Sequence, residues 1–127
     1  MIVVDSSVWI SVLRSKTSPE AAILTSLLDH DEVALAVPVK LEVLSGVKAA
    51  DLPRLRKALS ALPLLYPTDD TWRLIDRWFD KTSKAGQRFG LGDLLVAALA
   101  HEQHALVWSL DADFKRLEKL GLVQLYA

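Results

Sequence analysis

Short apolar runs alternate with helical segments along this 127-residue chain, which predicts an α/β fold with one mostly parallel central sheet flanked by helices. The first run, Ile2–Val4, has no polar alternation, as expected of a strand that is covered on both faces. Similar runs occur at residues 33–37 and 105–108. The length predicts a single domain over residues 1–127.

Capping residues and turn residues place the boundaries of the expected elements. Pro19 follows a serine at the first turn of a helix, a cluster at 68–71 can cap the longest helix, and Gly121 can end the last one. Helices are predicted at residues 8–14, 19–30, 38–47, 52–62, 71–84, 94–103 and 111–120, and strands at 2–4, 33–37, 64–66, 105–108 and 123–126.

The composition excludes several classes of protein. Hydrophobic residues make up 51% of the chain and the net charge is −1, so there is no global electrostatic attraction to nucleic acid. The absence of cysteine excludes a disulfide framework and a thiolate zinc site. No signal-peptide pattern and no apolar run of about 20 residues occur, so we expect a cytoplasmic protein without a membrane partner.

Four acidic residues follow predicted strands at corresponding places, and they are Asp5, Glu42, Asp93 and Asp111. Ligands of parallel sheets bind beyond the carboxyl ends of the strands, which is where Asp5 is expected. Glu42 lies on an apolar helix face, where a carboxylate is costly unless it is paired or bound to a cation. Each acid also has an ordinary interpretation, as a helix N-cap or, for Glu42, as one partner of a salt bridge. If all four converge, Mg²⁺ or Mn²⁺ is the natural partner, and such a site suits phosphoryl chemistry.

These acids occur in the segments 5–7 (DSS), 92–98 (GDLLVAA) and 109–114 (SLDADF), with Glu42 between the first two. In order and spacing they resemble the acidic motifs of PIN-domain nucleases. The length and the opening residues are similar to those of the VapC toxins of toxin–antitoxin pairs. The resemblance extends over the whole chain.

This resemblance implies a Mg²⁺- or Mn²⁺-dependent endoribonuclease that cleaves single-stranded or structured RNA as the toxin of a type II toxin–antitoxin pair. The residues that would be catalytic and hold the metal are Asp5, Glu42, Asp93 and Asp111. Asp113 would add an outer carboxylate, and the hydroxyls of Ser7 and Ser109 would support the site. A homodimer and a cognate antitoxin, whose tail lies over the site, are also implied. Trp108 departs from the family pattern, which usually has a smaller aliphatic residue there.

Basic residues form a row on the longest predicted helix, and they are Arg73, Arg77, Lys81 and Lys84, with Arg88 in the following loop. Spacings of four, four and three residues place the first four on one helical stripe. The row is either a weak RNA-binding surface or a solvated face whose charge Asp76 and Asp80 partly balance. The four tryptophans follow apolar patterns that indicate core or interface positions.

Other functions also place acids at strand ends. A metal-dependent phosphatase that forms an aspartyl phosphate requires a second aspartate two residues after Asp5, where Ser7 stands. A phospho-receiver domain requires an acceptor after a central third strand, and Asp69 fits that place poorly. A catalytically inactive PIN-like binding module is the remaining alternative, and the presence of all four acids argues against it.

Overall fold

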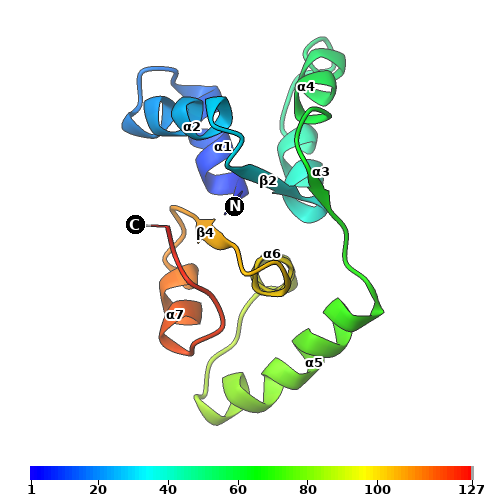
Figure 1. The fold of residues 1–127 in the computed structure, drawn as a ribbon, viewed down its shortest axis with the longest axis vertical. Coiled ribbons are helices and arrows are strands. Elements are labelled where there is room, and N and C mark those ends of the chain that lie inside the picture. Colours follow the sequence, from blue (N-terminus) through cyan, green and yellow to red (C-terminus); the bar gives the residue numbers. More distant parts are fainter. Residues whose placement is uncertain (127) are drawn as a thin grey trace.

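The computed structural model describes residues 1–126, and within this range four strands form one parallel sheet (Figure 1). The strands are β1 (Ile2–Val4), β2 (Val33–Ala36), β3 (Leu64–Leu65) and β4 (Leu106–Trp108). They lie in the order β3-β2-β1-β4, and each neighbouring pair is parallel. The predicted α/β fold with a parallel central sheet is therefore confirmed, and β1 is one of its two central strands.

Seven helices are described in the same range: α1 (Ser6–Arg14), α2 (Pro19–Asp29), α3 (Val37–Ser45), α4 (Leu52–Leu59), α5 (Asp69–Lys84), α6 (Leu91–Glu102) and α7 (Asp113–Lys119). Figure 1 shows α1 and α2 on one side of the strands, and α6 with α5 and α7 on the other. Helix α6 is seen end-on near the centre, which explains its apolar sequence, since residues 96–100 are all buried. None of the helices formed by the described residues is long and apolar enough to cross a membrane.

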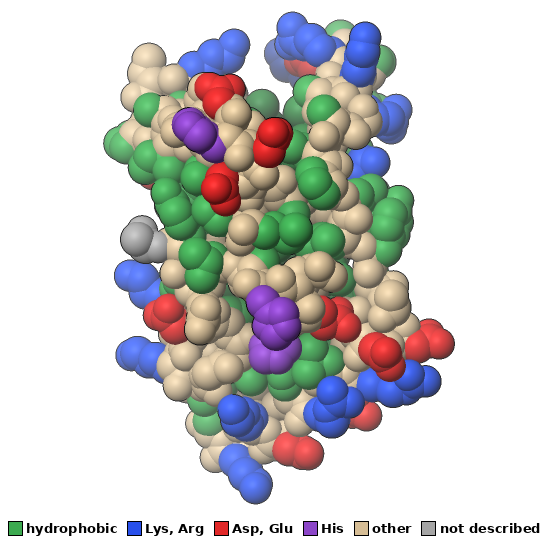
Figure 2. Space-filling view, viewed as in Figure 1, with side chains coloured by type: hydrophobic (Ala, Val, Ile, Leu, Met, Phe, Trp, Pro, Cys, Tyr) green, Lys and Arg blue, Asp and Glu red, His purple; other side chains and the backbone are tan. Residues whose placement is uncertain are grey.

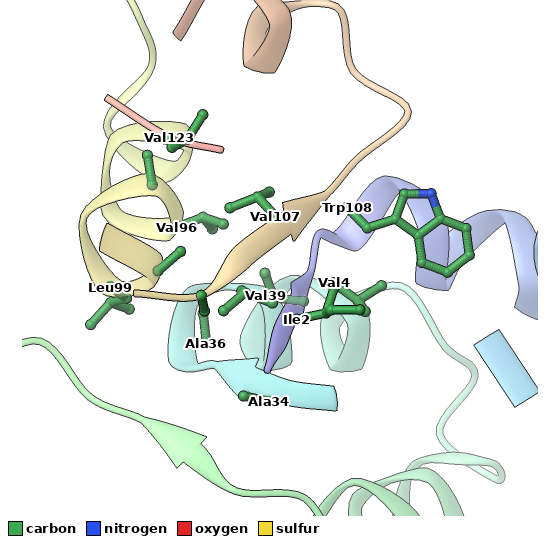
Figure 3. Packing of buried hydrophobic residues seen from close by; sticks show 14 of the residues in the cluster. Ile2, Val4, Ala34, Ala36, Val39, Val96, Leu99, Val107, Trp108 and Val123 are labelled. Atoms are coloured by element: carbon green, nitrogen blue, oxygen red, sulfur yellow. The ribbon is translucent and has the colours of Figure 1, made fainter. Parts of the chain in front are cut away.

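The core lies on both faces of the sheet (Figure 3). Val3 and Val4 of β1 have no exposed surface, because helices cover the sheet on both sides. In Figure 3, Val96 and Leu99 of α6 lie beside the strand that carries Val107. Three of the four tryptophans are buried as predicted, namely Trp9, Trp78 and Trp108, whereas Trp72 is exposed on α5.

Five helices begin at other residues than predicted, and the differences for α6 and α7 concern the acidic residues. Helix α6 begins at Leu91 with Gly90 at its N-cap, so Asp93 lies in the first turn instead of capping the helix. Helix α7 begins at Asp113, and Asp111 lies in the loop that precedes it. In both cases the acid is close to a helix start, and the sequence pattern alone did not distinguish a cap from its neighbours.

The fourth helix and the last strand are among the elements that are shorter than predicted. The fourth helix ends at Leu59, because residues 60–62 continue as turns with hydrogen bonds to carbonyls only three or four residues back. The predicted last strand at residues 123–126 forms one isolated parallel bridge, between Val107 and Leu125. This bridge places the described C-terminal residues along the outer edge of β4.

Candidate active site

Asp5 follows β1 directly and is almost completely buried, with 6% of its surface exposed. It occupies the N-cap position of α1, but its carboxylate makes no capping hydrogen bond. Instead, Oδ2 accepts hydrogen bonds from the hydroxyls of Ser7 and Ser109, each at 2.8 Å. The pairing of β1 with β4 brings these residues together, since the Asp5 N–H donates to the carbonyl of Trp108 at 2.8 Å. The capping interpretation of Asp5 is therefore wrong.

The two serines connect Asp5 to the loop that follows β4. The hydroxyls of Ser7 and Ser109 lie 3.2 Å apart. The backbone N–H of Leu110 donates to Ser7 Oγ at 3.0 Å, and that of Asp111 donates to Ser109 Oγ at 2.9 Å. Each hydroxyl thus holds the carboxylate on one side and the backbone of the loop on the other. The loop that carries Asp111 is fixed relative to Asp5 by these contacts.

Glu42 lies on α3 beside Pro38 and Val39, the apolar neighbours expected from the sequence, but its side chain is exposed. Both carboxylate oxygens accept a hydrogen bond from the hydroxyl of Ser6, each at 3.0 Å. The alternative of a salt bridge was wrong, because no ion pair among the described residues includes Glu42. Ser6 was not among the predicted site residues, although its place beside Asp5 was a signal that could have identified it.

Asp93, Asp111 and Asp113 form a tight cluster, in which one carboxylate oxygen from each residue lies within 4.8 Å of the other two. Asp93 comes from the first turn of α6, and the other two come from the loop before α7 and from its first residue. Asp111 also acts locally as a cap, because its Oδ1 accepts the N–H of Asp113 at 2.9 Å. The separations are small enough for one cation to contact all three residues.

A cavity of about 260 Å³ adjoins this cluster, between the starts of α1, α3 and α6. Its polar lining consists of Asp5, Ser6, Glu42 and Asp93, and its apolar lining includes Val39 and Val96. Asp93 belongs both to the cavity and to the cluster with Asp111 and Asp113. The five predicted carboxylates therefore lie in two overlapping groups that share Asp93.

The electrostatic environment of Asp93 reflects this crowding. Burial is the main cause that raises the pKa of Asp93 from 3.8 to about 6, and the negative charges of Asp111, Asp5, Asp113 and Glu42 raise it further. Carboxylates held this close disfavour one another's ionised form, and a bound divalent cation would reverse that penalty. The donors are carboxylates, the ligand type that suits Mg²⁺ or Mn²⁺ better than zinc.

His101 lies at the opposite end of α6 from Asp93. His101 is in the last turn of α6, roughly 12 Å along the helix axis from Asp93 at the usual rise per residue. Figure 2 shows the molecule from that end, with histidine side chains exposed near the middle, where Figure 1 shows α6 end-on.

The basic row on α5 is only partly available for a ligand. Arg73 forms an ion pair with Asp70 at 2.9 Å, and the ammonium group of Lys81 donates to the carbonyl of Leu120 at 3.2 Å. The other three residues of the predicted basic surface are Arg77, Lys84 and Arg88. All three are exposed, and within residues 1–126 their charged groups form no hydrogen bond or ion pair.

Arg116 of α7 is a further residue at the site that was not predicted. One nitrogen of its guanidinium group, Nη2, lies 2.8 Å from Oδ1 of Asp113. The other, Nη1, donates to Oε1 of Gln87 at 2.9 Å, in the loop between α5 and α6. The spacing of three residues between Asp113 and Arg116 was a usable signal, because such pairs are neighbours on a helix.

Comparisons with known proteins agree with this fold and this arrangement of acids. The family model described as "PIN domain" matches residues 2–120. Ribonuclease VapC11 of Mycobacterium tuberculosis and VapC ribonuclease Mb1587 of Mycobacterium bovis are each 28% identical over 129 residues, covering 98% of this chain and 96% of the relative.

Solved structures show the same fold. FitAcB from Neisseria gonorrhoeae superposes with a TM-score of 0.82 at 19% identity, covering 100% of this chain and 97% of the other. VapBC2 from Rickettsia felis, bound to a DNA fragment from its promoter, gives 0.80 at 17% identity, covering 99% and 98%. The match of the family model over nearly the whole chain shows that this protein belongs to the PIN domain family.

Proposed function

We propose that this protein is a metal-dependent endoribonuclease that acts as the toxin of a type II toxin–antitoxin pair. The observation that carries the proposal is the grouping of five carboxylates around Asp93, from segments up to 108 residues apart, at the carboxyl end of a parallel sheet. The VapC relatives, which are named ribonucleases and align over 98% of this chain, support RNA as the substrate. A structural neighbour from Klebsiella pneumoniae described as a toxin–antitoxin complex supports an antitoxin partner.

The proposed metal ligands are Asp93, Asp111 and Asp113, with Asp5 and Glu42 facing the adjoining cavity. When bound, Mg²⁺ or Mn²⁺ supplies a Lewis acid for a phosphate oxygen and lowers the pKa of a bound water. The serine hydroxyls hold Asp5 and Glu42 in fixed orientations, so these carboxylates need little rearrangement to act. The catalytic set is therefore Asp5, Glu42, Asp93 and Asp111, supported by Ser6, Ser7 and Ser109.

The cleavage experiment uses purified protein without antitoxin and a labelled single-stranded RNA. Cleavage should require Mg²⁺ or Mn²⁺, stop in EDTA and be lost in Asp93→Asn. Asp80→Asn, which removes an exposed carboxylate of α5, is the matched control and should cleave normally. Full activity of Asp93→Asn would contradict the site. Hydrolysis of an aryl phosphate without RNA cleavage would favour the phosphatase alternative, and no hydrolysis at all would favour an inactive binding module.

The RNA backbone is proposed to lie along Arg77, Lys84 and Arg88, whose exposed charges can neutralise phosphates without reading bases. Changing Arg77 and Lys84 to Ala should weaken binding about equally for all RNA sequences and flatten the dependence of affinity on salt. The matched control changes Arg73 and Lys81 to Ala, because both are engaged within the protein. If the affinity of the two double variants for RNA depends on salt concentration to the same extent, the basic residues of α5 form an ordinary solvated face and not an RNA-binding surface.

The homodimer implied by the family resemblance is proposed for the isolated protein as well. Light scattering at several protein concentrations measures its mass directly. A mass that stays at that of one 14.1 kDa chain across the range would exclude the dimer.

A further inference from the structure

We infer that Arg116 is a positioning residue that holds the acidic cluster in register, by tying Asp113 to the loop that leads into α6. This inference rests on the proposed metal site. The geometry that points to it is a single guanidinium group that contacts the start of α7 and three consecutive loop residues. Arg116 is not proposed as a metal ligand, and it affects the metal site only through the residues that it contacts.

The contacts of Arg116 use both ends of its planar head group. Nη2 lies 2.8 Å from Oδ1 of Asp113 and also donates to the carbonyl of Arg88 at 3.4 Å. Nη1 donates to Oε1 of Gln87 at 2.9 Å. The guanidinium carbon lies 4.3 Å from the centre of the Phe89 ring, which is a stacked cation–π arrangement. One side chain thus joins one carboxylate of the cluster to three consecutive residues of the loop.

Apart from Phe89, which packs against the hydrophobic core, the loop has few supports besides Arg116. The N–H of Gln87 donates to the carbonyl of Thr82 at 2.9 Å, but the N–H groups of residues 88–90 make none of the described backbone hydrogen bonds. A side chain placed at Gly86 or Gly90 would meet no atom within 4 Å, so no neighbouring segment lies beside the loop at the Cβ positions of these two residues. Gly90 is the N-cap of α6, and Asp93 lies three residues further on. The loop that Arg116 contacts therefore leads directly into the first turn of α6, which carries Asp93.

The charge of Arg116 and its positioning role predict opposite changes in metal affinity when the side chain is removed. A guanidinium beside the cluster repels a divalent cation, so removing its charge should tighten metal binding if charge were its only influence. If Arg116 positions Asp113 and the loop, its removal should instead weaken metal binding. An exposed ion pair of this kind adds little to fold stability, since the two side chains are 38% and 41% exposed. The sign of the change in metal affinity therefore separates the two roles.

Lysine should not replace arginine at this position. Lysine keeps the positive charge but lacks the planar fork that reaches Asp113 and Gln87 together, and it lacks the flat face that stacks on Phe89. Arg116→Lys is therefore expected to weaken metal binding in the same direction as Arg116→Gln, although it leaves the local charge unchanged.

The experiment measures Mn²⁺ binding to the free protein by electron paramagnetic resonance of the unbound ion, without RNA or turnover. Arg116→Gln should raise the dissociation constant for Mn²⁺ about 10-fold, as is typical when a group that orients a metal ligand is removed. The melting temperature of the metal-free variant should stay close to that of the parent. Hydrogen exchange of the Gln87 and Leu94 amides, which donate to the carbonyls of Thr82 and Gly90 at the two ends of the loop, should become faster, because the loop loses its attachment.

Two control variants separate the alternatives. Lys115→Gln removes an exposed positive charge from the same helix and should leave Mn²⁺ affinity unchanged or slightly higher. Asp93→Asn should weaken Mn²⁺ binding strongly, and if it does not, the proposed metal site is wrong whatever Arg116 does. Unchanged or tighter binding in Arg116→Gln, with a clear loss in Asp93→Asn, would overturn the positioning role alone. If Arg116→Gln fails to fold, Gln87→Ala, which removes only the loop contact, is judged by the same criterion.

Discussion

Replacing Asp93 with Asn should stabilise the metal-free protein at neutral pH, although Asp93 is the central carboxylate of the site. Burial, together with four neighbouring carboxylates, raises the pKa of Asp93 to about 6 in the folded protein. The folded state therefore binds a proton that the unfolded chain releases near pH 4. The stability that this proton provides is fully present below about pH 4 and is lost as the pH rises through about 6. Asparagine keeps the shape of the side chain and never ionises.

The size of the effect follows from two opposing contributions. The difference between 3.8 and about 6 corresponds to about 3 kcal/mol for a fully desolvated group, and solvent screening of the half-buried Asp93 reduces this to about 1–2 kcal/mol. The first turn of α6 favours a negative charge by about 0.3–1 kcal/mol, which asparagine forfeits. A net gain of about 1 kcal/mol remains, equivalent to a rise of about 3–5 °C in the melting temperature of a domain this size.

Thermal unfolding followed by circular dichroism, in EDTA at pH 7.5 and at pH 4, measures this gain. The variant should melt above the parent at pH 7.5, and most of the difference should vanish at pH 4, where Asp93 is protonated in the folded parent. Asp80→Asn is the control on an exposed helix face and should show no such dependence on pH. A variant that melts lower than the parent at pH 7.5, or by the same margin at both values, would refute the reasoning about crowded carboxylates.

Three further outcomes are expected. Mg²⁺ or Mn²⁺ at ten times its dissociation constant should stabilise the parent by about 1.4 kcal/mol, seen as a higher melting temperature that EDTA abolishes; a midpoint insensitive to both ions would count against the site. Phe114→Ala should lower the free energy of unfolding in urea by about 3–5 kcal/mol, because Phe114 is 1% exposed in the core. A loss under about 1 kcal/mol would show that neighbouring core side chains fill the space left by the ring. Thr71→Val should lower the free energy of unfolding by about 1–3 kcal/mol, because the buried Thr71 hydroxyl donates to Glu102 at 2.6 Å and accepts the Thr68 N–H at 2.9 Å. Thr71→Ser keeps the hydroxyl and should retain most of the stability of the parent.

The sheet and the carboxylates were predictable because their signals are local. β1 consists of three β-branched residues without helical periodicity, and Asp5 follows the last of them. The same logic located the strands at 33–36 and 106–108, and the parallel order of strands then placed the acids at one edge. Local signals also identified the capping box at Thr68, which the structure contains.

The details that were missed depend on contacts between distant segments. The hydroxyl of Ser6 donates to Glu42 of α3, whereas the hydroxyl of Ser7 donates to Asp5. The two serines are adjacent in the sequence, so only the folded position of α3 shows which of them contacts Glu42. Lys81 looked like part of an RNA-binding row, but the end of α7 lies close enough to accept its hydrogen bond. Arg116 was not identified from the sequence, because its loop partners are 27 to 29 residues away along the chain.

The order of the strands has a consequence for when the site can exist during synthesis. β1 is made first but lies between β2 and β4, and the backbone N–H of Asp5 reaches its partner, the carbonyl of Trp108, only after β4 has been made. Ser109, which holds the Asp5 carboxylate, and Asp113 of the cluster follow later still. A nascent chain that stops before residue 106 therefore exposes one edge of β1 and lacks the site. For a ribonuclease, this topology delays activity until most of the chain has been synthesised.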